Sequence, residues 1–187
     1  MDLPVDVTDL LRRAEAGEAE AADALFAATY RELRRLARAR LRAGGRNTLL
    51  DTTSLVHESY LRFVGAKRLR LEDRGHFLRY AGRVMRSVIV DFARRRNAGR
   101  RGGGAPRVPL GVEVPDGLPA AGEAEILRVH EALEGLAQLD PRMAQVVELR
   151  YFGGLSEAEI AEALGVTDRT VRRDWEKARL WLAEWLK

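Results

Sequence analysis

Two amphipathic segments that meet at Gly165 constrain the C-terminal part of the chain more tightly than any other feature. Ser156 precedes the first segment and Glu159 follows three residues later, which is the pattern of a capping box at a helix start. Gly165 allows a tight turn, and Thr167 is an N-cap candidate for a second helix. The sequence therefore predicts a helix-turn-helix.

The second of these segments separates apolar from basic residues. Its apolar side carries Val171, Trp175, Ala178 and Leu182, and its other side carries mostly Arg169, Arg172, Arg173, Glu176 and Lys177. A helix that contacts DNA needs such a basic side for phosphates and base edges, and an apolar side that packs on its neighbours. The alternative is a plain helical hairpin with a solvated charged face. We interpret the three tryptophans of this region as core residues.

Helix formers dominate the rest of the chain, and strand signals are almost absent. Helices are expected at about 19–43, from about 51 or 52 onwards, and at about 75–96. Residues 102–122 contain six of the 17 glycines and four of the six prolines, a composition typical of a linker. We predict an all-α chain with two small helical domains, residues 1–97 and 123–187, joined by a flexible Gly/Pro-rich linker at 98–122.

Composition excludes several classes of protein. The chain has 187 residues, no cysteine and three scattered histidines, so disulfides, thiolate chemistry and a histidine metal site are not expected. It shows neither an apolar run that could span a membrane nor a signal peptide, which predicts a cytoplasmic protein. The net charge of +4 is modest, so the distribution of charge matters more than its total.

The helix expected at 75–96 has an arginine stripe. Phe77, Ala81, Val84, Met85, Val88 and Phe92 cluster in one direction, and Arg79, Arg83, Arg86 and Arg94 lie opposite, with Val90 among them. No acidic residue occurs between Phe92 and Val112, while several more arginines do. Such a surface favours contact with nucleic-acid phosphates over the alternative of a solvated face.

Three segments in this order resemble the extracytoplasmic-function (ECF) group of bacterial RNA polymerase sigma factors. Residues 50–63, LDTTSLVHESYLRF, are similar to that group's helix for binding core polymerase. Residues 77–96, FLRYAGRVMRSVIVDFARRR, resemble its promoter-melting helix, and residues 136–186 resemble its C-terminal helix-turn-helix. The resemblance covers nearly all of the chain outside the linker.

The resemblance implies a set of partners and site residues. The N-terminal domain is expected to bind the clamp helices of the largest polymerase subunit and the −10 promoter element, the latter through Arg79, Arg83, Arg86 and Arg94. The loop between Gly65 and Gly75 would capture a flipped base. The C-terminal domain is expected to contact the polymerase flap and to read the −35 element through the following residues: Thr170, Arg172, Arg173 and Lys177.

The segment for binding core polymerase departs from the family pattern. An acidic cluster similar to Asp-Ala-Glu-Asp is usual before Leu-Val, whereas this chain has Asp51, Thr52, Thr53 and Ser54, with Glu58 further along. Phosphorylation of Thr53, or of Thr52 or Ser54, would restore negative charge at a helix N-terminus. The alternative is that these hydroxyl residues only cap the helix. Control by a Ser/Thr kinase or by an anti-sigma factor is therefore a hypothesis.

The sequence thus favours a sigma factor that promotes transcription initiation and needs no cofactor or metal. A helix-turn-helix regulator that acts independently of polymerase is the alternative. An enzyme is not expected, because the chain has no convergent carboxylates and no nucleophile–base pair, and its glycine run at 102–104 lacks the Lys-Ser/Thr of a P-loop.

Overall fold

The computed structural model describes residues 7–43, 52–65, 73–100 and 121–186, and every regular element in these ranges is helical. The elements are α1 (Val7–Glu15), α2 (Ala19–Ala43), α3 (Thr52–Val64), α4 (Arg74–Arg100), α5 (Ala121–Leu139), α6 (Pro141–Val147), the π-helical turn η1 (Glu148–Phe152), α7 (Glu157–Leu164) and α8 (Asp168–Trp185). The prediction of an all-α chain is confirmed.

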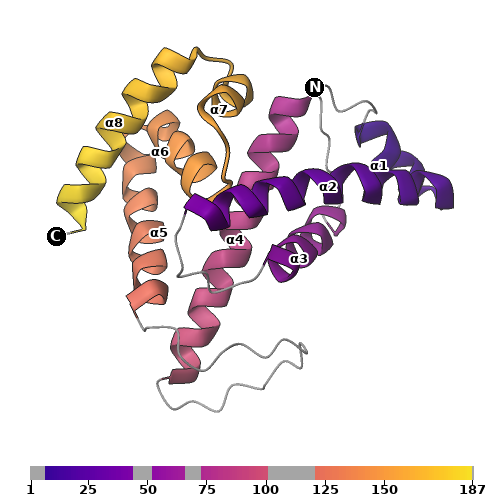
Figure 1. Ribbon diagram of the computed structural model, residues 1–187, viewed down its shortest axis with the longest axis horizontal. Coiled ribbons are helices and arrows are strands. Elements are labelled where there is room, and N and C mark those ends of the chain that lie inside the picture. Colours follow the sequence, from indigo (N-terminus) through magenta and orange to yellow (C-terminus); the bar gives the residue numbers. More distant parts are fainter. Residues whose placement is uncertain (1–6, 44–51, 66–72, 101–120, 187) are drawn as a thin grey trace.

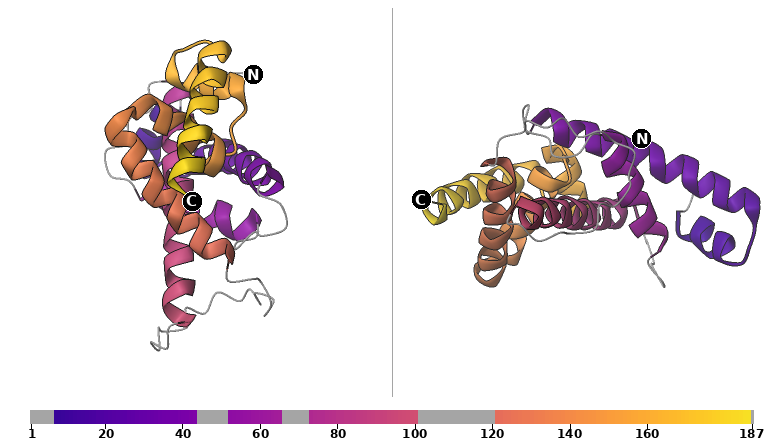
Figure 2. Two further views of the ribbon diagram at one scale, coloured as in Figure 1. Left: turned by 90° about the vertical axis from the view of Figure 1, so that its left-hand side faces the viewer. Right: turned by 90° about the horizontal axis from the view of Figure 1, so that it is seen from below.

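Helix α4 lies in the middle of the molecule. Helix α2 crosses α4, α1 and α3 lie on one side of α4, and α5 to α8 lie mostly on the other (Figures 1 and 2). We call α1–α4 the N-terminal half and α5–α8, with η1, the C-terminal half. Residues 101–120, which make up most of the expected linker at 98–122, are outside the described residues. The remaining residues of that segment belong to the ends of α4 and α5.

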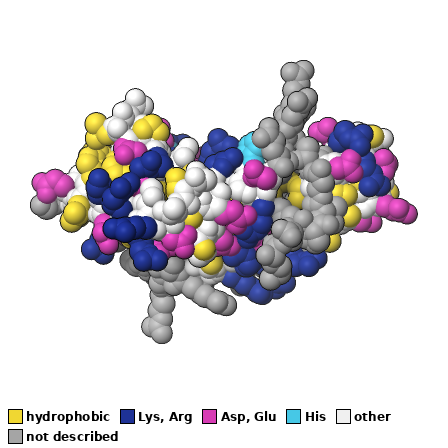
Figure 3. Space-filling view, turned by 90° about the horizontal axis from the view of Figure 1, so that it is seen from above, with side chains coloured by type: hydrophobic (Ala, Val, Ile, Leu, Met, Phe, Trp, Pro, Cys, Tyr) yellow, Lys and Arg dark blue, Asp and Glu magenta, His cyan; other side chains and the backbone are white. Residues whose placement is uncertain are grey.

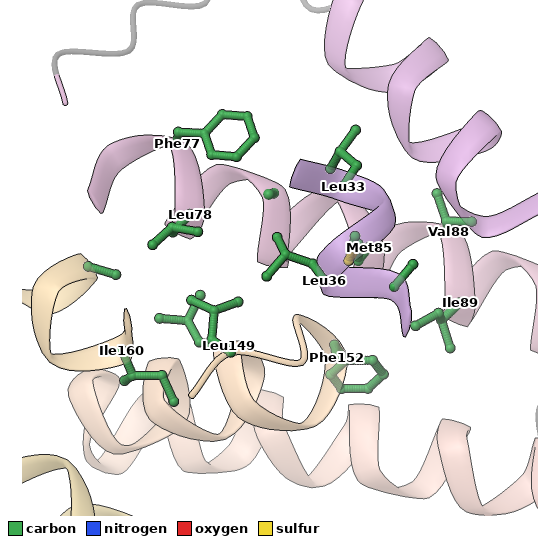
Figure 4. Packing of buried hydrophobic residues seen from close by; sticks show 14 of the residues in the cluster. Leu33, Leu36, Phe77, Leu78, Met85, Val88, Ile89, Leu149, Phe152 and Ile160 are labelled. Atoms are coloured by element: carbon green, nitrogen blue, oxygen red, sulfur yellow. The ribbon is translucent and has the colours of Figure 1, made fainter. Parts of the chain in front are cut away.

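One hydrophobic core extends through both halves. Leu33 and Leu36 of α2 pack with Phe77, Leu78 and Met85 of α4, and the same cluster continues into the C-terminal half (Figure 4). There it includes the following residues: Leu149, Phe152 and Ile160. Because a single core joins them, the two halves form one body in this structure, with α4 as the shared wall.

Local sequence signals explain the helix boundaries of the C-terminal half. Asp140 accepts a hydrogen bond from the amide of Met143 and Pro141 occupies the first turn, so α6 begins there. Ser156 and Glu159 form the expected capping box of α7, and Thr167 caps α8. Gly165 has a φ of 65°, a left-handed conformation that glycine adopts without steric cost, and it ends α7.

Candidate nucleic-acid interface

Helix α8 is fixed to the C-terminal half through one side only. Val171, Asp174 and Ala178 are buried. Asp174 is 3% exposed, and its carboxylate accepts a hydrogen bond from Nε of Arg142 at 2.7 Å. This bond ties α8 to α6 and sets which side of α8 faces solvent.

The opposite side of α8 carries the basic residues. Arg169, Arg172, Arg173 and Lys177 are exposed, and Thr170 is half-buried with its amide bonded to Thr167 Oγ1 at 3.3 Å. The four residues predicted to read DNA therefore lie on one helix, from its first turn to its middle. Figure 3 shows that Lys and Arg side chains gather in several groups on the face that it presents.

One α8 arginine is already engaged by an acid. Arg172 Nε lies 2.8 Å from Glu157, which also accepts from Arg150 at 3.2 Å. The hydrogen bond from Arg172, followed by that from Arg150, lowers the pKa of Glu157. The Arg150 guanidinium in turn lies over the ring of Trp175, 4.5 Å from the ring centroid, and this cation–π contact connects η1 to α8.

The arginine stripe of α4 faces the C-terminal half. Arg79 donates to the carbonyl oxygen of Ala163 in α7. Arg86 pairs with Glu134 of α5 and lies 3.7 Å from Glu148 of η1. Of the four predicted residues, Arg83 and Arg94 are exposed, whereas Arg79 and Arg86 are half-buried.

His130 of α5 lies between two of these arginines. Arg86 Nε donates to its Nδ1 at 3.2 Å, and Arg94 lies 3.1 Å from its Nε2. Burial lowers the pKa of His130, and the charges of Arg86 and Arg94 lower it further. Burial and the two arginines therefore disfavour the charged form of the imidazole at this position.

The segment predicted to bind core polymerase is described in part. Asp51 and the loop at 66–72 lie outside the described residues, as does the side chain of Thr52. Thr53 is exposed near the N-terminus of α3, while Ser54 and Glu58 are half-buried. The first turn of α3 contains no acidic residue, and Asp51 directly precedes it in the sequence.

An aromatic surface beside α3 was not predicted. Phe26 is 45% exposed and Leu61 is 49% exposed. The Phe26 ring stacks on Tyr30 with a centroid distance of 4.8 Å and meets Tyr60 edge-on at 5.0 Å. Phe26 is the most exposed of the three rings, because Tyr30 and Tyr60 are half-buried against the core.

The tryptophans of α8 are core residues only in part. Trp175 and Trp181 are half-buried, but Trp185 is 44% exposed and stacks on Trp181 at a centroid distance of 6.3 Å. Near its C-terminus α8 is contacted by α5 on one side, where Arg128 donates to the carbonyl oxygen of Leu186, and this contact leaves Trp185 partly exposed. The expectation of three core tryptophans is therefore wrong for Trp185.

The structure was also searched for metal and membrane features. In the part of the chain that the structure describes, no group of three His, Cys, Asp or Glu side chains is placed to hold a metal ion. None of the described helices is both long and apolar enough to cross a membrane.

Comparison with protein families gives one match. The sequence model of the family described as ECF sigma factor matches residues 4–187, which is nearly the whole chain. No curated protein and no solved structure matches the chain. The family match includes both the arginine-striped helix α4 and the α7–α8 pair, and the chain belongs to the ECF sigma factor family.

Proposed function

We propose that this chain binds core RNA polymerase and directs it to promoters, with α8 contacting the −35 element and α4 contacting the −10 element. Family membership implies RNA polymerase binding and transcription initiation. The observation that carries the finer proposal is the exposed basic side of α8, which stands opposite the buried residues Val171 and Ala178. The factor itself catalyses no covalent step.

Helix α8 suits the −35 contact because its basic residues begin at the turn after α7. In a helix-turn-helix, the N-terminal residues of the second helix contact base edges in the major groove. Thr170 and Lys177 are available for that role, and the exposed Arg173 lies 3.5 Å from Asp174, a contact that a phosphate can also replace. Arg172 is paired with Glu157, but an exposed ion pair contributes little stability, so a DNA phosphate can replace the carboxylate.

Helix α4 suits the −10 contact because of its arginines. Arg79, Arg83, Arg86 and Arg94 give one helix four guanidinium groups, which bind phosphates with bidentate geometry. Promoter melting also requires unpaired bases to be held by protein, and the loop before α4 would supply that pocket.

We propose that α3 and its aromatic neighbours contact the polymerase clamp. Glu58 and Thr53 supply polar groups from α3, and Asp51 and Thr52 precede them in sequence. Phe26 and Leu61 add exposed apolar area beside them. Aromatic and apolar anchors surrounded by polar groups are typical of protein interfaces.

Phosphorylation of Thr53 would strengthen this contact. Thr53 is exposed in the first turn of α3, where no acid is present. A phosphate there adds about −1.5 to −2 charges at the end of the helix that favours anions. A Ser/Thr kinase would then control the affinity for polymerase, with Thr52 and Ser54 as neighbouring candidates.

The phosphorylation proposal is tested by the affinity of Thr53→Glu, Thr53→Ala and the unmodified protein for core polymerase. We expect Thr53→Glu to bind more tightly than Thr53→Ala. His57→Glu, an acid on an exposed position one turn later, is the control for added charge alone. Equal affinities for the two Thr53 variants would refute phosphorylation control and support simple helix capping.

The whole proposal is tested by run-off transcription with purified core polymerase, on a DNA fragment from upstream of the protein's own gene. Addition of the protein should produce a defined transcript, and Arg173→Ala/Lys177→Ala should reduce its yield. A protein that footprints DNA alone and never supports core-dependent initiation would be a regulator that acts without polymerase.

A further inference from the structure

The contacts between the two halves have a consistent polarity. In every ion pair between the halves that the structure describes, the arginine belongs to the N-terminal half and the glutamate to the C-terminal half. The pairs are Arg35–Glu159, Arg74–Glu162, Arg74–Glu159 at 3.4 Å, Arg86–Glu134, Arg86–Glu148 at 3.7 Å and Arg96–Glu123 at 2.7 Å. The carboxylates thus form an acidic surface matched to a basic one.

From this polarity we propose that the C-terminal half masks the part of the arginine face of α4 formed by Arg79 and Arg86, by presenting a backbone carbonyl and carboxylates where DNA phosphates would bind. The two halves must then separate before Arg79 and Arg86 can bind DNA. This inference rests on the proposed function of α4 and concerns its regulation. In the free protein, the chain's own C-terminal half covers this surface of α4.

The packing at this interface leaves no room for a DNA strand. A Cβ on Gly82 of α4 would lie 2.7 Å from Cδ2 of Leu149, and one on Gly153 would lie 3.3 Å from Cα of Gly82. Near the start of α4, a Cβ on Gly75 would lie 3.2 Å from Cα of Ala163. Glycines therefore bring the two backbones into close contact, and DNA and the C-terminal half exclude each other from this part of α4.

The masking leaves one DNA surface open. Arg169, Arg173 and Lys177 of α8 remain exposed while Arg79 and Arg86 of α4 contact the C-terminal half. A masked protein would therefore bind duplex DNA through α8 but bind single-stranded DNA poorly. The helix-turn-helix reads duplex grooves, so the two kinds of DNA report separately on α8 and α4.

The interface also contains a buried charge that favours opening. Arg40 of α2 is 8% exposed and lies over the ring of Tyr151, 4.5 Å from its centroid. Its Nε has no hydrogen-bond partner and no carboxylate forms an ion pair with it among the described residues, so Tyr151 and the charge of Glu125 stabilise it only in part. Burying a cation without a counter-ion is costly, so separation of the halves would recover part of the energy needed to expose the shared apolar core.

The test uses two opened variants of the full chain. Gly82→Gln places a side chain against Leu149 without changing any arginine, and glutamine is a better helix former than glycine. Ala98→Gln, an exposed position on the same helix, is its control. Glu134→Arg/Glu162→Arg replaces two exposed interface acids, and Glu15→Arg/Asp23→Arg on exposed positions of α1 and α2 is the control with the same change in net charge.

Two quantities are measured for each protein. Small-angle X-ray scattering gives the radius of gyration, and fluorescence anisotropy gives the affinity for a labelled single strand and a labelled duplex of about 20 nucleotides. We expect both opened variants to expand and to bind the single strand at least about tenfold more tightly than their controls. We expect Gly82→Gln to bind the duplex with unchanged affinity.

Four results would overturn the proposal. Expansion without a gain in single-strand affinity would show that the interface hides no DNA surface. A gain for Glu134→Arg/Glu162→Arg that its charge-matched control equals would reflect net charge alone, and a failure of both variants to expand would show that the halves do not separate. An opened variant that binds neither probe would refute the DNA-binding surfaces of the proposed function, and the masking with them.

Discussion

A pair of glycine substitutions provides a quantitative test of how the C-terminal half docks on α2. Gly154 and Gly165 have nearly the same left-handed conformation, with φ of 67° and 65°. A Cβ on Gly154 would lie 2.6 Å from the amide nitrogen of Arg40 and 2.7 Å from the carbonyl oxygen of Leu36. A Cβ on Gly165 would meet nothing within 4 Å.

Both Gly→Ala variants suffer the same conformational cost, and only one suffers a clash. The left-handed conformation costs an alanine about 1–2 kcal/mol, which is the whole effect expected for Gly165→Ala. Gly154→Ala also forces apart two backbone segments, because the atoms that it meets belong to α2 itself and cannot rotate away. Overpacking of this kind costs about 1–3 kcal/mol more. A chain of this size loses roughly 2–4 °C in Tm per kcal/mol.

The measurement is urea or thermal unfolding of the two variants beside the unmodified protein. Equal losses of stability for Gly154→Ala and Gly165→Ala would refute the close contact between the halves. The contact also predicts non-additivity, since the extra cost at position 154 should disappear in the Gly82→Gln background, where the halves are apart. Persistence of the extra cost in that background would mean that it arises within the C-terminal half.

Four further outcomes follow from the contacts. Arg173→Ala/Lys177→Ala should weaken duplex binding on all sequences and reduce the salt dependence of log Kd by roughly 0.9 for each lost phosphate contact, measured by anisotropy across a salt series. Ser156→Ala removes the capping box and should lower the free energy of unfolding by about 1 kcal/mol in urea titrations. Burial alone would raise the pKa of Glu159, but hydrogen bonds from Ser156 and the nearby Arg35 guanidinium lower this pKa. The stability that the Glu159 carboxylate contributes should therefore be lost as pH falls through the depressed pKa, and Glu159→Gln should lack this pH-dependent contribution. Burial, with help from two arginines, lowers the pKa of His130, so the unmodified protein should lose stability as pH falls below about 6.5 and His130→Gln should lose less.

The sequence was sufficient to predict features that depend on local signals. The boundaries of α2 agree with the expected 19–43, and Ser156 and Thr167 are the N-caps of α7 and α8, as the sequence predicted. Helix α4 continues to Arg100 rather than ending near 96, because nothing between Asn97 and Arg100 stops a helix as strongly as proline would. Each of these outcomes is decided by residues within one or two turns of each other.

Features that depend on contacts between distant segments were not predictable. Val90 lies among the arginines of α4 and is 2% exposed, which shows that this side of the helix is covered as well as the other. The partners of Arg86 are 48 and 62 positions away in the sequence, at Glu134 and Glu148. An isolated helical pattern cannot distinguish an arginine that awaits a phosphate from one that is already paired with a glutamate.

The same chemistry explains why one arginine face can serve two ligands. A guanidinium group binds a carboxylate and a phosphate through the same pair of N–H donors, so the charge of α4 does not discriminate between them. Discrimination comes from packing, because Gly82 and Gly153 admit the C-terminal half to a depth that a side chain would prevent. Closure therefore depends on apolar and backbone contacts as well as on ion pairs, and salt weakens only the ion pairs, whereas DNA binding depends on phosphate contacts that salt weakens. Raising the salt concentration should consequently reduce the affinity of an opened variant for single-stranded DNA much more than it changes the radius of gyration of the unmodified protein.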